Sequence, residues 1–291
     1  MNDISHRPPF HGLVLLIMAS LVLPAQAAEP VYLKRTVSQV QEKPDDLTTD
    51  KAHYRPIFGL GDEQTGILKG IARYGELTVD PGGDTKMVSC EKEEQACFVL
   101  NGNGVLHYGD ETASLEQNDF MYLPVGIKRQ LSNSSDRPLR VLIMGYWIPE
   151  GARASVPPKL MIANADDVPQ QVLGQHGPTT QFKLLLGNSR STRDKIAAGT
   201  QITSLFLMDF AAGGTNIPHR HTREEEIYYV LRGRGEMVAG QTPDGKEARY
   251  KCTEGDVFYF PPSTLVGFYS GASEGEPHSQ ILAVRSPCPA R

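Results

Sequence analysis

The stretch Gly213–Gly233 reads GGTNIPHRHTREEEIYYVLRG, and its spacing decides how the rest of the chain is interpreted. The first glycine is followed after five residues by His219-Arg220-His221, then after four more by Glu226, and after another six by the second glycine. Residues i and i+2 of a strand point to the same side, so we expect His219 and His221 to project together. Glu226, on the returning strand, can complete a set of two imidazoles and one carboxylate, which suits Fe, Mn, Ni, Cu or Zn.

The charges in this stretch have a simpler alternative explanation. An exposed hairpin would leave Arg220, Arg223 and the acidic run 224–226 as solvated side chains. That explanation suits Arg223 and Glu224. It does not suit the two histidines and Glu226, because a carboxylate buried beside two imidazoles is costly without a cation to pair with.

An earlier part of the chain repeats the pattern of turns and strands. Twenty residues separate Gly82 from Gly102, as they do Gly213 from Gly233. The next interval is twenty residues in the first copy, at 104–124, and twenty-six in the second, at 235–261. The turn-rich insertion 240–245 accounts for the six extra residues and predicts a hairpin tip.

Two copies of a strand-and-turn pattern predict an all-β protein with two tandem domains. The 28 glycines and 21 prolines, scattered through the chain, suit many short strands joined by tight turns. We place the N-terminal domain at 28–150, a linker at 151–180 and the C-terminal domain at 181–291.

In these residues the chain resembles the cupin superfamily, whose members are small jelly-roll β-barrels. The stretch that begins at Gly213 matches the first cupin motif in residue type and spacing. The second motif, a glycine, five residues, Pro-x-Gly, two residues and a histidine, is present only in part. Here it reads Gly255, five residues, Pro261-Pro262-Ser263, two residues and Val266. The resemblance implies a bicupin in which the usual fourth metal ligand, a histidine, is replaced by Val266.

Two further residues are candidates for the same site. His278, near the start of the last strand, could supply the missing ligand, although a histidine at a strand end more often faces solvent. Tyr228 shares the face of Glu226 and could enter the cavity as a catalytic acid or base, or could be a core aromatic.

The first barrel carries none of the three ligands. Val88, Cys90 and Gln95 stand where the second barrel has its histidines and glutamate, and Arg129 stands at the fourth position. Valine and glutamine are poor ligands, so we predict that the metal site is lost there. Arg129 could bind an acidic ligand, pair with a nearby carboxylate or reach solvent.

The cysteines suggest disulfides if the protein is exported. Cys90 and Cys97 would lie opposite each other in a hairpin that turns near 93–94, which favours pairing Cys90 with Cys97 and Cys252 with Cys288. The alternative is four free thiols.

The N-terminal residues predict export. An apolar run at 12–23 precedes small residues at 25 and 27, which is typical of a signal peptide spanning 1–27. The run is too short for a membrane anchor, so we expect a periplasmic or secreted protein and no membrane partner. A net charge of −5 argues against nucleic acid as a partner.

The function expected from these features is metal-dependent chemistry on a small organic substrate. Two histidines and one carboxylate in a cupin favour a dioxygenase-like oxidoreductase with one divalent transition metal as cofactor. The alternatives are a non-redox lyase, isomerase or hydrolase that uses the metal as a Lewis acid, and a non-catalytic metal or small-ligand carrier. A homo-oligomer is compatible with the sequence.

Overall fold

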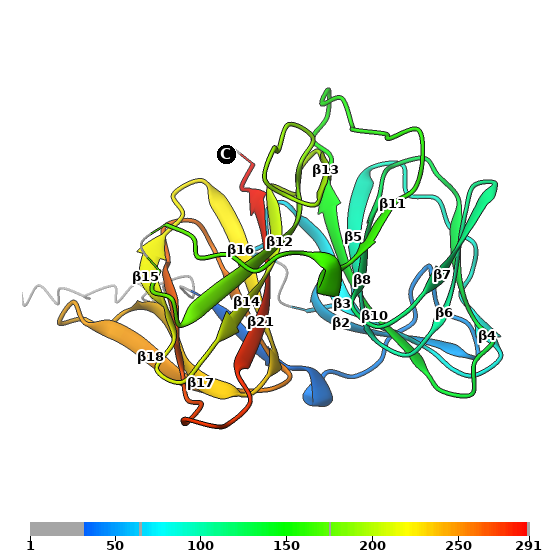
Figure 1. Ribbon diagram of the computed structural model, residues 1–291. Coiled ribbons are helices and arrows are strands. Elements are labelled where there is room, and N and C mark those ends of the chain that lie inside the picture. The colour runs from blue at the N-terminus through cyan, green and yellow to red at the C-terminus, as the bar shows by residue number, and fades with distance from the viewer. Residues whose placement is uncertain (1–31, 64–65, 175, 290–291) are drawn as a thin grey trace, which may run out of the picture.

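The computed structural model describes residues 32–63, 66–174 and 176–289 (Figure 1). Within these ranges the regular structure is β-strand, with two short 3-10 helices, η1 (Val37–Gln39) and η2 (Ala165–Asp167), which confirms the all-β prediction. Among these residues no helix is long and apolar enough to cross a bilayer. The predicted signal peptide, 1–27, lies outside the described residues.

The N-terminal barrel is built from two sheets. The larger has the order β11-β8-β5-β10-β3-β2, with bounds Met161–Asn164, Asp119–Leu123, Glu93–Asn101, Leu139–Trp147, Ile71–Val79 and Ala52–Gly59. The smaller has the order β4-β9-β6-β7, with bounds Gly83–Asp84, Arg129–Asn133, Gly104–Tyr108 and Glu111–Leu115. Strand β11 falls inside the stretch 151–180 that the sequence suggested as a linker.

The C-terminal barrel has the same plan. Its larger sheet has the order β1-β19-β16-β21-β14-β12-β13, with bounds Leu33–Thr36, Asp256–Phe260, Glu224–Arg232, Ser279–Pro287, Ser204–Phe210, Thr180–Asn188 and Ile196–Gly199. Its smaller sheet has the order β15-β20-β17-β18, with bounds Thr215–Arg220, Leu265–Ser270, Arg234–Gln241 and Glu247–Thr253. The predicted hairpin tip falls between β17 and β18.

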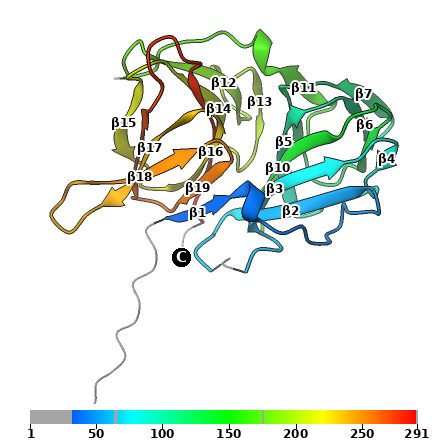
Figure 2. The same ribbon diagram turned by 90° about the horizontal axis from the view of Figure 1, so that it is seen from below.

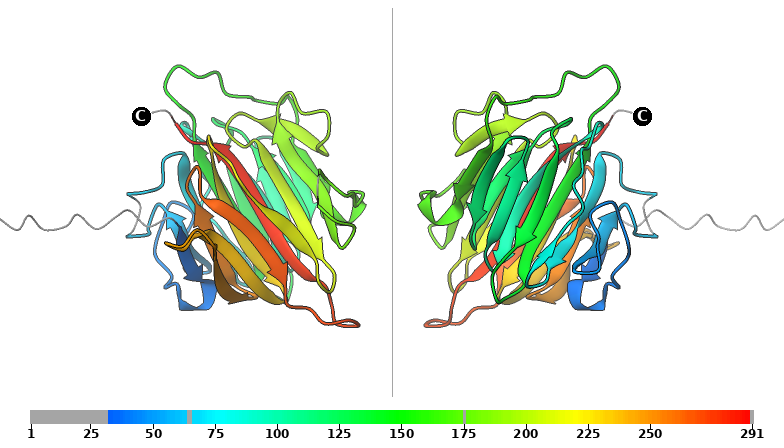
Figure 3. Two further views of the ribbon diagram at one scale, coloured as in Figure 1. Left: turned by 90° about the vertical axis from the view of Figure 1, so that its left-hand side faces the viewer. Right: turned by 90° about the vertical axis from the view of Figure 1, so that its right-hand side faces the viewer.

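Three hydrophobic cores explain why the central strands are apolar on both faces. One core fills each barrel, and a third lies between the two larger sheets, which face each other. Along β16, Tyr228 belongs to the core inside the C-terminal barrel, whereas Ile227 and Tyr229 belong to the core between the barrels. Figure 3 shows the larger sheet of each barrel from its own side. Such strands read as continuous hydrophobic runs rather than as alternating ones.

The first described strand belongs to the C-terminal barrel, and the chain passes from it to the N-terminal barrel. Strand β1 pairs with β19 of the C-terminal barrel, although it precedes every strand of the N-terminal barrel in the sequence. Figure 2 shows β1 beside β19 and then the chain passing to β2. This N-terminal segment, residues 33–51, which we call the arm, therefore ties the two barrels together.

A buried glutamate of each barrel also holds a loop of the other. Glu94 on β5, fully buried, accepts backbone N–H groups at 2.6–2.8 Å from three consecutive residues of the loop after β13: Thr200, Gln201 and Ile202. The hydroxyl of Tyr122 on β8 donates to the same carboxylate at 2.7 Å.

A glutamate of the C-terminal barrel holds a loop of the N-terminal barrel in the same way. Glu225 on β16 accepts the backbone N–H groups of Lys69 and Gly70, at 2.7 and 2.6 Å, and the hydroxyl of Tyr259. The barrels are thus joined by two equivalent contacts, which we call the carboxylate clamps.

Neither predicted disulfide is formed among the described residues. Cys97 lies on β5 and faces Met121 and Ile143 on the neighbouring strands, whereas Cys90 lies before the strand. No hairpin turns at 93–94, because β5 begins there, so the expected pairing geometry does not arise. Cys252 lies on β18, and Cys288 follows the last strand.

Candidate metal centre

The structure brings His219, His221 and Glu226 together at one end of the C-terminal barrel. One donor atom of each side chain can be chosen so that all lie within 4.8 Å of one another. The Nε2 atoms of the two histidines are 3.0 Å apart, and His221 Nε2 lies 3.6 Å from Glu226 Oε2. Two donors at right angles, each about 2.1 Å from one ion, are about 3.0 Å apart, so this spacing fits adjacent ligands of a transition metal.

The orientation of the His219 ring is fixed by the backbone. His219 lies on β15, and its Nδ1 is 2.9 Å from the carbonyl oxygen of Ile217. A neutral imidazole that donates its Nδ1 proton to this carbonyl has a free lone pair on Nε2, the atom that approaches His221. Metal-binding histidines commonly donate their other ring N–H in this way.

His221 lies just beyond the end of β15, among charged neighbours. Its Nδ1 is 3.3 Å from Arg285 Nη1 and 3.6 Å from Glu224 Oε2. Burial first, and then the positive charges of Arg285 and His219, lower the pKa of His221 to about 4. The ring is therefore neutral near pH 7, which is the state that can bind a metal.

Glu226 is the buried member of the trio. Neither carboxylate oxygen accepts a hydrogen bond of ordinary length from the described residues, although the nearby Tyr228 hydroxyl acts to lower the pKa of this carboxyl. Its titratable or charged neighbours are His221 Nε2, at 3.6 Å, and Arg285 Nε, at 3.9 Å. Burial raises the pKa of Glu226 to about 8, an effect that Arg285 opposes. A buried carboxylate without hydrogen bonds costs free energy unless a cation compensates it, so the donor set fits a metal ion.

The trio lines a cavity of about 180 Å³ inside the barrel. Apolar side chains cover one flank, among them Phe182, Phe206 and Met208. For scale, an apolar cavity of about 150 Å³ can hold benzene. A small organic molecule therefore has room beside the trio.

Among the cavity residues that the sequence did not indicate, Arg285 and His176 lie against the trio. Arg285 lies on β21 directly opposite Glu226, and only strand pairing reveals that relation. His176 lies in the segment between the barrels, with its ring 5.9 Å from that of His219 and its Nδ1 accepting the N–H of Ile217 at 3.1 Å. Burial and the neighbouring His219 lower the pKa of His176.

His278 does not lie with the trio, contrary to the suggestion that it supplies a fourth ligand. Its ring contacts Asp209 and is half exposed. Arg285, the partner of Glu226 in β21, follows His278 by seven residues, which is about 23 Å of extended strand. Val266 is buried and pairs with His219 across β15 and β20, so an apolar side chain does stand at the fourth position.

Tyr228 lies in the same cavity, as expected from its position two residues after Glu226. Its hydroxyl accepts a hydrogen bond from Asn216 Nδ2 at 2.9 Å. Burial and the carboxylate of Glu226 raise its pKa well above the usual value. Tyr228 therefore keeps its proton at neutral pH and can act as a donor in the cavity.

The corresponding place in the N-terminal barrel holds an arginine. Arg129 bridges to Val88 as Val266 pairs with His219. Its guanidinium is buried and lies 3.0 Å from Cys90 Sγ, so it does not reach solvent, and it forms no ion pair with a carboxylate of the described residues. Gln95 is also buried there and contacts Cys90 at 3.9 Å.

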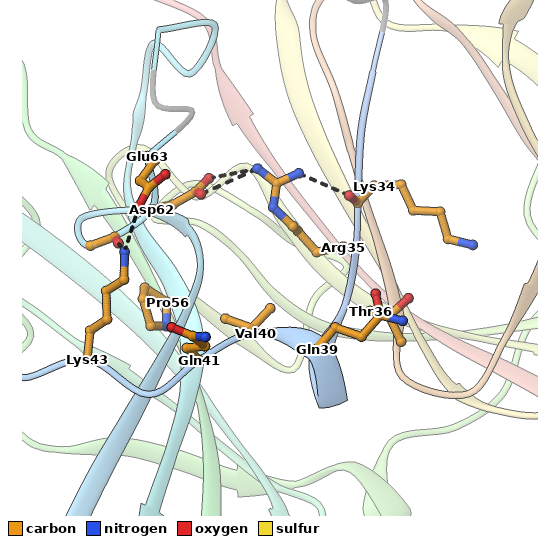
Figure 4. Close-up of a pocket in the computed structure, with 11 residues that line it drawn as sticks. Lys34, Arg35, Thr36, Gln39, Val40, Gln41, Lys43, Pro56, Asp62 and Glu63 are labelled. Carbon is orange, nitrogen blue, oxygen red and sulfur yellow. Dashed lines mark hydrogen bonds and ion pairs between the residues drawn. The ribbon is translucent and has the colours of Figure 1, made fainter.

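A larger hollow, of about 630 Å³, lies elsewhere on the molecule, between the arm around β1 and the turn after β2 (Figure 4). Its charged side chains are already paired. Arg35 contacts Asp62 at 3.3 Å, and Lys43 contacts Glu63 at 3.7 Å. These ion pairs fasten the arm, and the hollow lacks the convergent unpaired groups of the metal centre.

Comparison with known proteins agrees with this architecture. Residues 75–145 and 206–276 each match the family model described as the cupin domain. Germin-like protein subfamily 2 member 3 of Arabidopsis thaliana is 42% identical over 62 residues, 21% of this chain and 28% of that protein. Germin-like protein 8-2 of Oryza sativa subsp. japonica is 29% identical over 121 residues, 36% of this chain and 53% of that protein. The alignments thus cover about a quarter to a half of these relatives.

Solved structures match over nearly the whole chain. The putative glyoxylate induced protein from Pseudomonas aeruginosa has a TM-score of 0.71 at 15% identity, covering 92% of this chain and 94% of that one. The formate complex of oxalate decarboxylase from Lactobacillus farciminis has a TM-score of 0.65 at 12% identity, covering 88% and 86%. Likeness at such low identity concerns the fold alone.

Proposed function

Because the chain is a bicupin of the cupin superfamily, with one cupin domain in each barrel, we propose that it is a metal-dependent enzyme acting on a small organic molecule. The observation that carries this proposal is the His219, His221 and Glu226 group at the wall of a cavity inside the barrel. We assign the reaction to the C-terminal barrel, because the N-terminal barrel holds Arg129 at the equivalent place.

His219, His221 and Glu226 would hold the metal, and they would be its three protein ligands. When bound, Fe, Mn, Ni, Cu or Zn would supply Lewis acidity, and the redox-active members of that series would also supply oxygen chemistry. Three protein ligands leave positions open for a substrate and dioxygen, so we favour a dioxygenase-like oxidoreductase.

Neighbouring residues orient the ligands and favour the protonation states that metal binding needs. The Ile217 carbonyl orients His219, and the Arg285 guanidinium favours the ionised form of Glu226 that metal binding needs. Tyr228 holds a proton at its hydroxyl, next to the trio, and can donate it to an oxygen of the substrate. The apolar flank around Phe206 excludes bulk water, which strengthens these interactions.

The protonated Tyr228 also favours a second candidate. In a non-redox lyase, isomerase or hydrolase, this hydroxyl would be the general acid while the metal polarises a carbonyl.

We propose further that the protein is exported and folds in the periplasm or outside the cell. Its metal would then be drawn from ions available there, and the general affinity order favours Cu(II) and Zn(II) over Fe(II) and Mn(II). The partner would be a small-molecule substrate, with neither nucleic acid nor membrane involved.

The first test is the metal content of protein purified from its native compartment, in the wild type and in two variants. His219→Ala should lose the metal, whereas His278→Ala, a histidine outside the trio, should keep about one ion per chain. Full metal content in His219→Ala would refute the ligand assignment.

Oxygen consumption separates the chemical alternatives. With a panel of small organic acids, alcohols and amides, a dioxygenase should turn over only when oxygen is present and should consume it in step with the substrate. Turnover that continues without oxygen would favour the non-redox candidate. Tight metal binding with no turnover would instead leave a carrier.

A further inference from the structure

The cavity contains polar groups that the metal centre does not use. Ser204 on β14 and Asn216 on β15 both line it, and each side chain is about 1% exposed. Ser204 Oγ and Asn216 Oδ1 have no hydrogen-bond partner in the described part of the chain. Buried polar atoms are nearly always paired, so two such atoms from different sheets lining one cavity indicate hydrogen bonds to a ligand.

A guanidinium completes this set. Arg193 lies in the loop between β12 and β13, is exposed and also lines the cavity. Its side chain has neither an ion pair nor a hydrogen bond among the described residues. Arg285 differs, because its guanidinium already contacts Glu224 and Glu226. Arg193 is therefore the cationic group of the cavity that is available to a ligand.

Charge and volume narrow the chemistry of that ligand. Two arginines and one carboxylate line the cavity, and a bound divalent ion would make it more positive, so an anion is favoured. A free guanidinium fork matches a carboxylate, with which it forms paired, charge-assisted hydrogen bonds. A volume of about 180 Å³ is roughly six times the 30 Å³ share of one liquid water, which suits about six non-hydrogen atoms.

We propose that Arg193 binds the carboxylate of the substrate, and that the substrate is a small carboxylic acid bearing a hydroxyl or amino group. The hydroxyl or amino hydrogen meets Asn216 Oδ1, and Ser204 Oγ supplies a second hydrogen bond. The short carbon skeleton packs against the flank formed by Phe206 and Met208. This inference rests on the proposed function, and it names the substrate class and the residue that selects it.

The test uses three probes with the same number of non-hydrogen atoms: lactate, lactamide, which lacks the charge, and isobutyrate, which lacks the hydroxyl. Their binding is measured by titration calorimetry or NMR, on protein as purified and after metal removal. The metal-free series separates binding by Arg193 from chelation by the metal.

Arg193→Met should weaken lactate binding by about 10- to 100-fold, as expected for loss of a charge-assisted hydrogen bond. Arg190→Met is the matched control, because Arg190 is exposed in the same loop, carries the same charge and does not line the cavity. It should change lactate binding less than twofold. In the wild type, lactamide and isobutyrate should both bind more weakly than lactate.

Several results would overturn the inference. Equal losses in the two arginine variants would mean a general effect of charge, and no loss in either would mean that Arg193 does not bind the acid. Lactamide as tight as lactate would exclude a carboxylate, and isobutyrate as tight would exclude the hydroxyl contact. If the protein binds lactate through Arg193 but holds no metal, the proposed function fails while this site stands. If it holds metal but is indifferent to Arg193→Met, the reverse is true.

Discussion

Replacing Glu226 by glutamine should remove a large pH dependence from the stability of the metal-free protein. The carboxylate is buried without a hydrogen bond of ordinary length from any described residue, and burial raises its pKa to about 8. In the unfolded chain the same group titrates near 4.5. The folded state therefore keeps a proton that the unfolded state releases, and stability falls as the pH rises from about 4.5 through 8.

The magnitude follows from the two pKa values. Each unit of difference corresponds to about 1.4 kcal/mol, so the full window of about 3.5 units corresponds to roughly 5 kcal/mol. His221 acts in the opposite direction. Its folded-state pKa of about 4 lies below the usual 6.5, so its contribution is lost as the pH falls below 6.5. Between pH 6.5 and 8, Glu226 titrates and His221 does not, so the free energy of unfolding should fall by about 2 kcal/mol because of Glu226.

The measurement is urea unfolding of the metal-free protein at pH 6.5 and 8.5, for the wild type, Glu226→Gln and Glu63→Gln. Glu63 is 90% exposed and serves as the control, which should keep the wild-type slope. Glu226→Gln should lose the Glu226 part of that slope, because glutamine does not titrate. If Glu226→Gln and the wild type lose the same stability between the two pH values, the burial argument for Glu226 is wrong.

Three further changes test other parts of the structure. Glu94→Ala should destabilise the protein by about 3–5 kcal/mol in urea unfolding, because it leaves several buried donors unpaired; a loss below about 1 kcal/mol would contradict the role of the carboxylate clamp. Val266→His places an imidazole opposite His219 and should tighten metal binding about tenfold or more in competition with a chelator, and weaker binding would show that the position does not reach the metal. Tyr228→Phe should keep the metal content but cost about 1–2 kcal/mol of stability, because Asn216 Nδ2 loses its acceptor; loss of the metal would instead make the hydroxyl part of the ligand arrangement.

The fold could be predicted from the sequence because its turns recur at fixed intervals. The equal spacing of Gly82–Gly102 and Gly213–Gly233 reflects equivalent strands, β5 and β16, each followed by a glycine turn. The arm could not be predicted in the same way. Strand β1 is four residues long and pairs with β19, more than two hundred residues away, and no local pattern encodes such a partner.

The site was predicted where residues lie close in the sequence and missed where they do not. His219, His221 and Glu226 lie within one hairpin, so strand geometry brought them together correctly. Arg285 reaches the trio only through the pairing of β21 with β16, and His176 comes from the segment between the barrels, where the sequence has no regular period. His278 does not reach the trio, because it stands just before β21, seven residues from Arg285, the residue of that strand that lies opposite Glu226.

The carboxylate clamps have a consequence for how the two halves can change. Glu94 and Glu225 join the barrels by the same contact in both directions, as in a symmetric pair of identical subunits. In a homodimer every substitution appears in both partners. In one covalent chain it appears in one half only, so Arg129 can stand in the first barrel without disturbing His219 or Glu226 in the second. The shared interface is thereby preserved while the two interiors diverge, and one half is free to serve purely as the scaffold of the other.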